Sequence, residues 1–472
     1  MAQPSAPQEK KRLLSGKDLF FMAMGQTIGA GIITNTGLAI GLAGSGVILA
    51  YLLAFVVTYI GNLPNLLFAT IHPVTSPTYV STSWLNRKLG GYWLYTQIFA
   101  ALAQAYMGSA FGTYVASIVD VNPNLVACIV LVVFYIINLY DLKTSAMVQN
   151  VTTAFLICTI ASFIILGLPQ CDLGSMFSSE NFFYGGWLGI FNGCALVLFG
   201  VGGCALLPQF GPDMENPHRN IPLMTNIVYV CAFLAFGGVA FVGSGVAPIA
   251  EVAGQPMTYQ SQIIYPGNWY LLFVIGGALL AITTTINSNF ARYWATIIRG
   301  VDEGWLPPVF AKRNKHGVPW ILHTVFFLMA FIPNAIGMNI GALAGLASAI
   351  SLIPQLIPVW GFVLMPDHCP EDWAQAKKLS RIFASKGARI LLCLISTVLI
   401  GIFVVLNVLE FSQFTTIFFF AYFIITGIIC FGFGSRILAA GDKRALAKQG
   451  PGPAGWSPNG RERPSPKIKE VS

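Results

Sequence analysis

Long apolar runs, separated by short polar stretches, recur along nearly the whole chain. A helix needs roughly 20 residues to cross the hydrocarbon core of a bilayer, and most of these runs reach that length. They leave no room for a large soluble domain. The pattern therefore predicts twelve membrane helices, at residues 18–41, 46–68, 91–119, 125–140, 146–168, 186–209, 221–246, 269–298, 319–337, 339–365, 388–407 and 412–434.

This pattern divides the chain into three parts. A cytoplasmic N-terminal segment covers residues 1–17, a membrane domain covers 18–435, and a cytoplasmic tail covers 436–472. The end of the tail is rich in proline, glycine and basic residues and poor in large apolar side chains. Such segments bury too little apolar surface to offset the entropy of folding, so we expect disorder there.

Composition and charge support the membrane prediction. The chain is 55% hydrophobic and only 9% charged, whereas soluble domains carry roughly a quarter charged residues. The net charge of +8 does not indicate a nucleic-acid partner, because lysine and arginine concentrate in alternate loops, as they do on the cytoplasmic side of membrane proteins. The basic loops contain Lys17, Arg87, Lys143, Arg219, Arg299, Lys312, Lys377 and Arg436. The intervening loops contain Asp120, Asp172, Glu180, Glu251 and Glu410. We therefore expect a multi-pass protein of the cell membrane with both termini in the cytoplasm.

The first predicted span contains a cluster of glycines, Gly25, Gly29 and Gly31. Each glycine costs a helix about 1 kcal/mol relative to alanine, so a local break near Gly29 is expected. Within a membrane, unpaired backbone groups are tolerated only where they face protein or a water-filled cavity. A break would therefore present amide and carbonyl groups to a bound solute. Close packing between helices, for which small residues are also used, is the alternative interpretation.

A second glycine cluster, Gly200, Gly202 and Gly203, lies five spans later. Interrupted helices at matching places in two halves are typical of transporters built from inverted repeats. Each break offers a helix N-terminus to an anion and carbonyl oxygens to a cation. The pair therefore suits a zwitterion, and no acidic residue is needed inside a span.

Three motifs occur in order: IGAGI in the first span, FGVGG followed by ENPHRNIP at the sixth, and RGVDEGWLPPVFAKRNKHGVP after the eighth. Together they resemble the amino acid, polyamine and organocation superfamily, and in particular its amino acid permeases, over roughly residues 15–435. The resemblance implies an all-α, LeuT-like fold of two inverted five-helix repeats, 18–168 and 186–365, with two extra helices in 388–434. It also implies alternating access around a central site.

Site residues follow from the resemblance position by position. Beside Gly29, the amides of Ala30 and Gly31 match the family's carboxylate-binding groups. The carbonyls of Val201 and Gly202 match its acceptors for the substrate amine.

Phe199 matches the aromatic gate that the family places over the substrate, although packing or lipid contact is the usual role of a membrane phenylalanine. Weaker candidates from the same mapping are Gln26, Ala101, Tyr106 and Asn289. Small residues beside an aromatic gate leave room for a bulky apolar or aromatic substrate.

Two further features of the sequence bear on energy coupling. The proton-coupled branch of the family carries a lysine in span five, seven residues after a glutamine. Counting from Gln149, this chain has Leu156 at that position, which favours exchange or facilitated diffusion. Thr283, Thr284 and Thr285 offer hydroxyls for sodium, unless they only bond to their own helix. The speculative sodium site comprises Gly25, Ile28, Thr284 and Thr285.

The sequence thus predicts a secondary transporter that moves an amino acid or related amine, working by exchange. Sodium- or proton-coupled symport is the alternative. A membrane enzyme is disfavoured because the spans contain no paired carboxylates, no histidine cluster and no Ser-His-Asp set. A channel is disfavoured as well, because it does not need the two related halves that the glycine clusters indicate. No cofactor is expected, the nine cysteines show no metal-ligand spacing, and His72 and His323 are interpreted as structural or interfacial residues.

Overall fold

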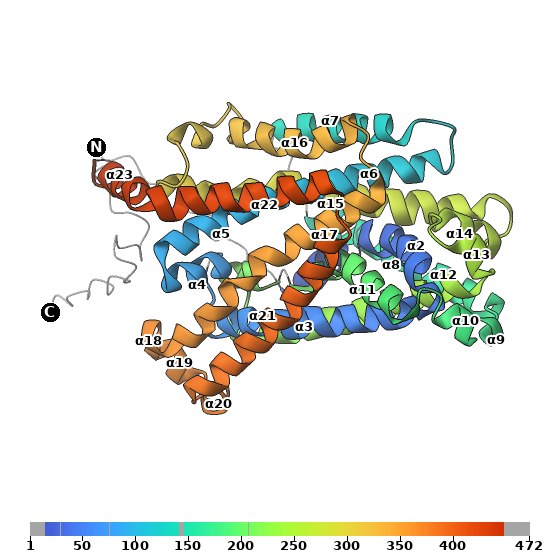
Figure 1. The fold of residues 1–472 in the computed structure, drawn as a ribbon, viewed down its shortest axis with the longest axis horizontal. Coiled ribbons are helices and arrows are strands. Elements are labelled where there is room, and N and C mark those ends of the chain that lie inside the picture. The colour runs from blue at the N-terminus through green and yellow to red at the C-terminus, as the bar shows by residue number, and fades with distance from the viewer. Residues whose placement is uncertain (1–14, 29, 75, 141–145, 206, 448–472) are drawn as a thin grey trace, which may run out of the picture.

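The computed structural model describes residues 15–28, 30–74, 76–140, 146–205 and 207–447, and these residues form helices without any strand. Most of the long helices run along the long axis of the molecule, side by side or at moderate angles (Figure 1). The predicted all-α architecture is confirmed.

Helices occupy all twelve predicted ranges. In the first half they are α1 (Gly16–Thr27), α2 (Ala30–Ala43), α3 (Val47–Ile71), α4 (Pro77–Leu85), α5 (Arg87–Phe99), α6 (Ala103–Ala116), α7 (Pro123–Leu139) and α8 (Ala146–Gly167). The second half contains α11 (Gly186–Val201), α12 (Pro217–Gly245), α15 (Leu280–Asp302), α16 (Trp320–Ala335) and α17 (Ile340–Leu356). The chain closes with α21 (Lys386–Leu409), α22 (Gln413–Gly427) and α23 (Gly434–Ala447).

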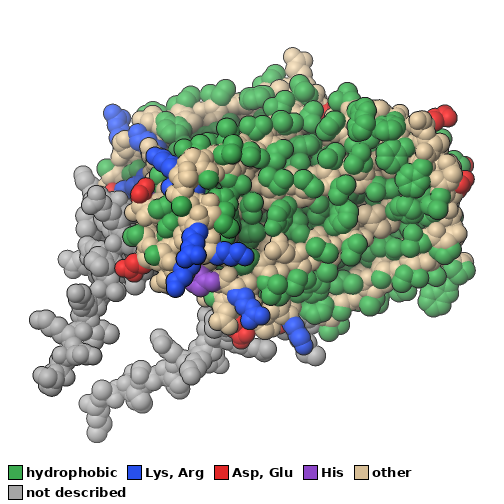
Figure 2. Space-filling model, turned by 90° about the horizontal axis from the view of Figure 1, so that it is seen from below, with side chains coloured by type: hydrophobic (Ala, Val, Ile, Leu, Met, Phe, Trp, Pro, Cys, Tyr) green, Lys and Arg blue, Asp and Glu red, His purple; other side chains and the backbone are tan. Residues whose placement is uncertain are grey.

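Short helices cap the two ends of the molecule. One end carries α9 (Leu173–Met176), α10 (Ser179–Phe182), α13 (Ile249–Val252) and α14 (Thr258–Ile264). The other carries α18 (Met365–His368), α19 (Pro370–Gln375), α20 (Lys377–Ile382) and α23 (Figure 1). Lysine and arginine side chains gather at this second end (Figure 2), which we call the basic end; the first is the loop end.

Eight helical stretches among the described residues are long and apolar enough to cross a membrane, and the first of them, Gly16–Ile71, covers the first two predicted spans. Two shorter apolar helices, α7 and α16, add to these. Hydrophobic side chains cover the flank between the two ends (Figure 2). Phe414, for example, is 73% exposed, as expected of a surface that faces lipid.

The core forms where the broken helices meet the rest. Helix α11 packs against α2, α3 and α17, and α1 packs against α8 and α12. A large buried cluster runs through these contacts and includes Ile32, Tyr51, Tyr106 and Phe236. This cluster surrounds the two glycine-rich segments.

Helix α23 continues past the last predicted span, which ends at residue 434, and reaches Ala447. The cytoplasmic tail 436–472 stays a prediction. The helix is held because Gly441 packs against the backbone at Gly304, where an added Cβ at Gly441 would lie 2.9 Å from the Gly304 Cα atom. Arg87 and Asp442 also pair at 3.1 Å. The expected disorder of residues 448–472 lies outside the described residues.

Candidate substrate site at two helix breaks

The first membrane helix is interrupted where the glycine cluster predicted. Helix α1 ends at Thr27, and the amide of Ile28 closes it by donating to the Met24 carbonyl at 2.8 Å. Gly29 lies outside the described residues, and α2 begins at Ala30. The first amides of α2 have no partner within their own helix, which makes this N-terminus suited to an anion.

The second glycine cluster also ends an α-helix. Helix α11 stops at Val201, and residues Gly202–Ala205 continue as a tighter 3₁₀ turn. Gly202 closes α11 through its amide, which donates to the Leu198 carbonyl. Carbonyls in the last turn of an α-helix lack α-helical partners and carry the negative end of its dipole.

The two breaks lie directly against each other. A Cβ added at Gly31 would lie 2.3 Å from the Gly200 Cα atom, and one added at Gly200 would lie 2.8 Å from the Gly31 Cα atom. Gly203 packs in the same way on Thr27, with its added Cβ 2.7 Å from the Thr27 Cα atom. Close packing therefore explains these three glycines, so the alternative interpretation holds for part of each cluster.

Gly202 differs from its neighbours. No heavy atom lies within 4 Å of a Cβ added at this residue. Its backbone angles, φ −57° and ψ −23°, are open to any L-amino acid. Neither packing nor conformation requires glycine at this position, so Gly202 adjoins open space at the end of α11.

An aromatic pair lies beside this segment. Phe199 is half-buried and meets the ring of the fully buried Tyr106 edge-to-face, with 5.7 Å between the ring centroids. The Tyr106 hydroxyl donates to the Asn35 side chain of α2. Asn35 donates in turn to the Leu196 carbonyl of α11 at 3.3 Å. The network thus ties α6 to both broken helices.

Other predicted residues lie in different surroundings. Ala101 is fully buried in a separate apolar cluster with Leu94 and Trp305, and no described contact brings it to Phe199. Gln26 on α1 and Asn289 on α15 are half-buried.

The threonines of the speculative sodium site bond to their own helix. Thr284 and Thr285 both donate to the Ala281 carbonyl, at 3.0 and 2.9 Å. Their proposed partners Gly25 and Ile28 lie buried at the end of α1, and α1 does contact α15. A threonine hydroxyl that donates within its helix keeps its oxygen lone pairs, so the sodium site stays a prediction.

Leu156, at the position of the family's lysine, is 1% exposed on α8, the helix that packs against α1. An apolar side chain therefore fills a place next to the first broken helix. It cannot carry a proton or replace a bound cation.

Sequence reasoning missed Asn35 and Ser348. Both are fully buried, and both donate to the Leu196 carbonyl, Ser348 at 2.8 Å. Asn35 lies between Thr34 and Thr36 in the middle of an apolar span. Polar side chains inside a membrane span are costly and mark functional positions, so this residue carried a usable signal.

Comparison with known proteins agrees with the motifs. The amino acid permease family matches residues 14–431. A branched-chain amino acid permease of Bacillus subtilis is 23% identical over 423 residues, which cover 84% of this chain and 89% of the relative. An aromatic amino acid transport protein of Escherichia coli K12 is 23% identical, covering 74% and 78%. A lysine-specific permease of Lactococcus lactis is 24% identical, covering 72% and 73%.

These relatives are transporters, and the prediction that the chain is not an enzyme is confirmed. The match to the family extends from α1 into the last long helix and includes both helix breaks. The chain therefore belongs to the amino acid permease family, within the amino acid, polyamine and organocation superfamily.

Proposed function

We propose that this permease carries an amino acid or a related amine across the cell membrane by alternating access, with its substrate held at the two helix breaks. The proposal includes twelve membrane crossings, a five-plus-five inverted repeat with two extra helices, and cytoplasmic termini. It is supported by family membership and by the meeting of two interrupted helices at Gly31 and Gly200.

The recognition groups in this proposal belong to the backbone. The amides of Ala30 and Gly31, beside Gly29, open α2 and bind the substrate carboxylate. The carbonyls of Val201 and Gly202 lie where α11 ends and accept from its amine. The dipoles of both helix ends favour these charges, so the site needs no ionised side chain.

The open space beside Gly202 is the main observation in favour of this substrate site. A glycine whose added Cβ would meet no neighbour, and which is not needed for its backbone angles, leaves room for a ligand. Phe199 and Tyr106 supply an aromatic wall from α11 and α6. Gln26, Ala101 and Asn289 remain weaker candidates.

The helices around this space favour an apolar or aromatic substrate. Asp, Glu, Lys and Arg are all missing from the sequences of α2, α6 and α11. A lysine substrate would find no carboxylate for its side-chain ammonium on these helices. Branched-chain and aromatic amino acids, named for two of the relatives, meet this requirement better.

We favour exchange as the mode of transport. The buried Leu156 cannot carry a proton or replace a cation, whereas the family's proton-coupled branch has a lysine at this position. Sodium- or proton-coupled symport is the second candidate, and the contact between α1 and α15 is the observation in its favour.

Counterflow in proteoliposomes tests this mode. Vesicles loaded with unlabelled leucine or phenylalanine should take up the labelled amino acid faster than empty vesicles do. Uptake should not change when choline replaces sodium or when a proton gradient is dissipated. Accumulation in empty vesicles that follows a sodium or proton gradient would show that symport is correct.

Gly202→Leu tests the site itself. The substitution should lower uptake at least about tenfold, because the side chain fills the substrate space, while the unfolding temperature in detergent stays close to that of wild type. Gly401→Leu is the control, since a Cβ there also meets no neighbour but lies on α21. Undiminished uptake by Gly202→Leu would place the substrate elsewhere.

A further inference from the structure

Three potential metal ligands meet at the basic end, outside the broken helices. His72 directly follows α3, whereas Cys369 and Asp372 lie around the start of α19. About 300 residues of sequence separate the histidine from the other two, which is why sequence spacing gave no sign of this cluster. From the sequence alone, His72 is interpreted as a structural or interfacial residue.

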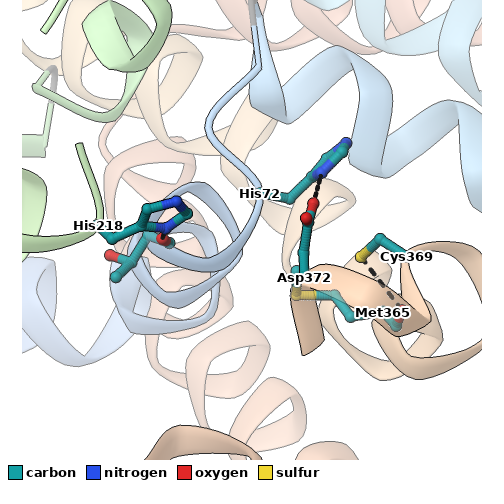
Figure 3. Close-up of polar contacts among 6 residues, drawn as sticks. His72, His218, Met365, Cys369 and Asp372 are labelled. Atoms are coloured by element: carbon teal, nitrogen blue, oxygen red, sulfur yellow. Dashed lines mark hydrogen bonds and ion pairs between the residues drawn. The ribbon is translucent and has the colours of Figure 1, made fainter. Parts of the chain in front are cut away.

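His72 and Asp372 point toward each other, and Cys369 lies nearby with its thiol turned to the Met365 carbonyl (Figure 3). One potential ligand atom from each lies within 4.8 Å of the others. The His72 Nδ1 atom is 2.6 Å from Asp372 Oδ2, and the Cys369 thiol donates to the Met365 carbonyl at 3.2 Å. His72 and Cys369 are buried, and the Asp372 side chain is 35% exposed.

This ligand set has the chemistry of a zinc site. Thiolate, imidazole and carboxylate are the groups that bind Zn²⁺, commonly three from the protein with a water in the fourth position. At bond lengths of about 2.0–2.3 Å, tetrahedral ligands lie roughly 3.3–3.8 Å apart. The His72–Asp372 pair must therefore open by about 1 Å, and the Cys369 sulfur must turn from the Met365 carbonyl.

The surroundings can support an ion. Phe68, Phe362 and Cys393 pack with Cys369 in one apolar cluster, and the ring of Trp84 lies 5.7 Å from that of His72. A dry, aromatic lining strengthens the attraction between a cation and its charged ligands. The exposed part of Asp372 leaves a path by which an ion and a water molecule can enter.

We propose that His72, Cys369 and Asp372 bind a divalent zinc ion at the basic end of this permease. The ion replaces the hydrogen bond between His72 and Asp372, and Cys369 gives up its thiol proton to solvent on binding. Affinity consequently rises with pH. The bound ion links the end of α3 to the α18–α19 segment, and the site is independent of the substrate site.

Zinc binding is measured directly on the purified full-length protein. After treatment with a chelator and removal of the chelator, ZnCl2 should bind at one site per chain and raise the unfolding temperature. Cobalt should show the near-ultraviolet thiolate-to-metal absorption that requires a cysteine ligand. Neither readout uses transport, so failure here leaves the proposed transport function untouched.

Substitutions assign the ligands. Cys369→Ser, His72→Gln and Asp372→Asn should each weaken zinc binding by about tenfold or more, and Cys369→Ser should abolish the cobalt band. His218→Gln and Cys158→Ser are matched controls, because His218 bonds the Thr70 carbonyl and Cys158 is an exposed cysteine. Each variant is first checked for an unfolding temperature like that of the metal-free wild type.

Two results would overturn the proposal. One is zinc affinity in Cys369→Ser equal to that of the wild type, which would mean adventitious binding elsewhere. The other is no zinc binding by the wild-type protein, which would identify His72 and Asp372 as a hydrogen-bonded pair that only joins two segments.

Discussion

Different kinds of contact join the segments at the two ends of this permease. At the loop end, the segment between α13 and α14 lies directly on the backbone of α2. The Gly254 amide donates to the Gly37 carbonyl at 3.0 Å. A Cβ added at Gly37 would lie 2.0 Å from the Gln255 carbonyl oxygen. This contact is made by main-chain atoms, so it responds little to pH or salt.

At the basic end, charged and polar side chains also join segments, beside the main-chain contact of Gly441 with Gly304. Glu303 accepts from the Tyr79 hydroxyl and pairs with Arg299 at 3.4 Å. Arg87 pairs with Asp442 of α23 at 3.1 Å. Such contacts weaken when a group titrates or when salt screens it. Solution conditions can therefore weaken these side-chain contacts at the basic end, whereas the contact between Gly37 and Gly254 is lost only when main-chain segments separate.

Gly37→Ala should cause the largest loss of stability, because the added methyl group clashes with the segment between α13 and α14. Overpacking of this kind costs about 1–3 kcal/mol, so the unfolding temperature in detergent should fall by several degrees. Gly401→Ala, where the added Cβ has no neighbour, should be neutral or slightly stabilising. If the two variants unfold alike, the loop end is not held by main-chain contact.

Glu303→Gln should have an intermediate effect on the unfolding temperature, and this effect should depend on pH. Burial raises the pKa of the Glu303 carboxyl above its usual 4.5, against the opposing influence of Tyr79 and Arg299. The folded protein then keeps this proton at pH values where the unfolded chain has lost it. Stability contributed by the group is therefore complete below about pH 4.5 and declines as pH rises through the folded-state pKa.

Thermal unfolding across this range compares wild type with Glu303→Gln. The variant lacks the titrating group, so the unfolding temperature of wild type relative to the variant should decrease as pH rises. Glu180→Gln, a change in an exposed side chain at the loop end, should show no such trend. A wild-type advantage that grows with pH would mean that the ion pair with Arg299 outweighs burial.

Asp442→Asn should cause the smallest loss of stability of the three substitutions. Both partners of the Arg87–Asp442 pair are more than a quarter exposed, and such pairs contribute about 0.2–1 kcal/mol. The loss in unfolding temperature should be small at low salt and vanish near 1 M salt, where the Debye length is about 3 Å. A loss that persists at high salt would show that α23 is held by packing that Asp442 maintains.

The helical fold and the positions of the breaks could be predicted from sequence. Apolar runs fix the helices because hydrocarbon tolerates no unpaired backbone, and the glycines around Gly29 and Gly202 mark the weak points of two of them. The role of each glycine could not be predicted in the same way. Gly31 and Gly202 look alike in sequence, yet one packs against Gly200 and the other adjoins open space.

The remaining differences between the sequence-based predictions and the structure come from contacts between segments that are distant in sequence. Gly441 of α23 meets Gly304, and His72 meets Asp372, only after folding. Polar residues with no periodic pattern give no hint of such partners. The twelve crossings, the repeat and the substrate-binding roles stay predictions.

The contact between Gly31 and Gly200 has a genetic consequence. In most packed pairs, a larger side chain on one helix can be rescued by a smaller one on its partner. Here both partners already lack a side chain, and an added Cβ at either residue would approach the other's Cα atom within 3 Å. A loss of transport caused by substitution at Gly31 should therefore have no suppressor at Gly200, and selection for revertants should recover only glycine at the original position.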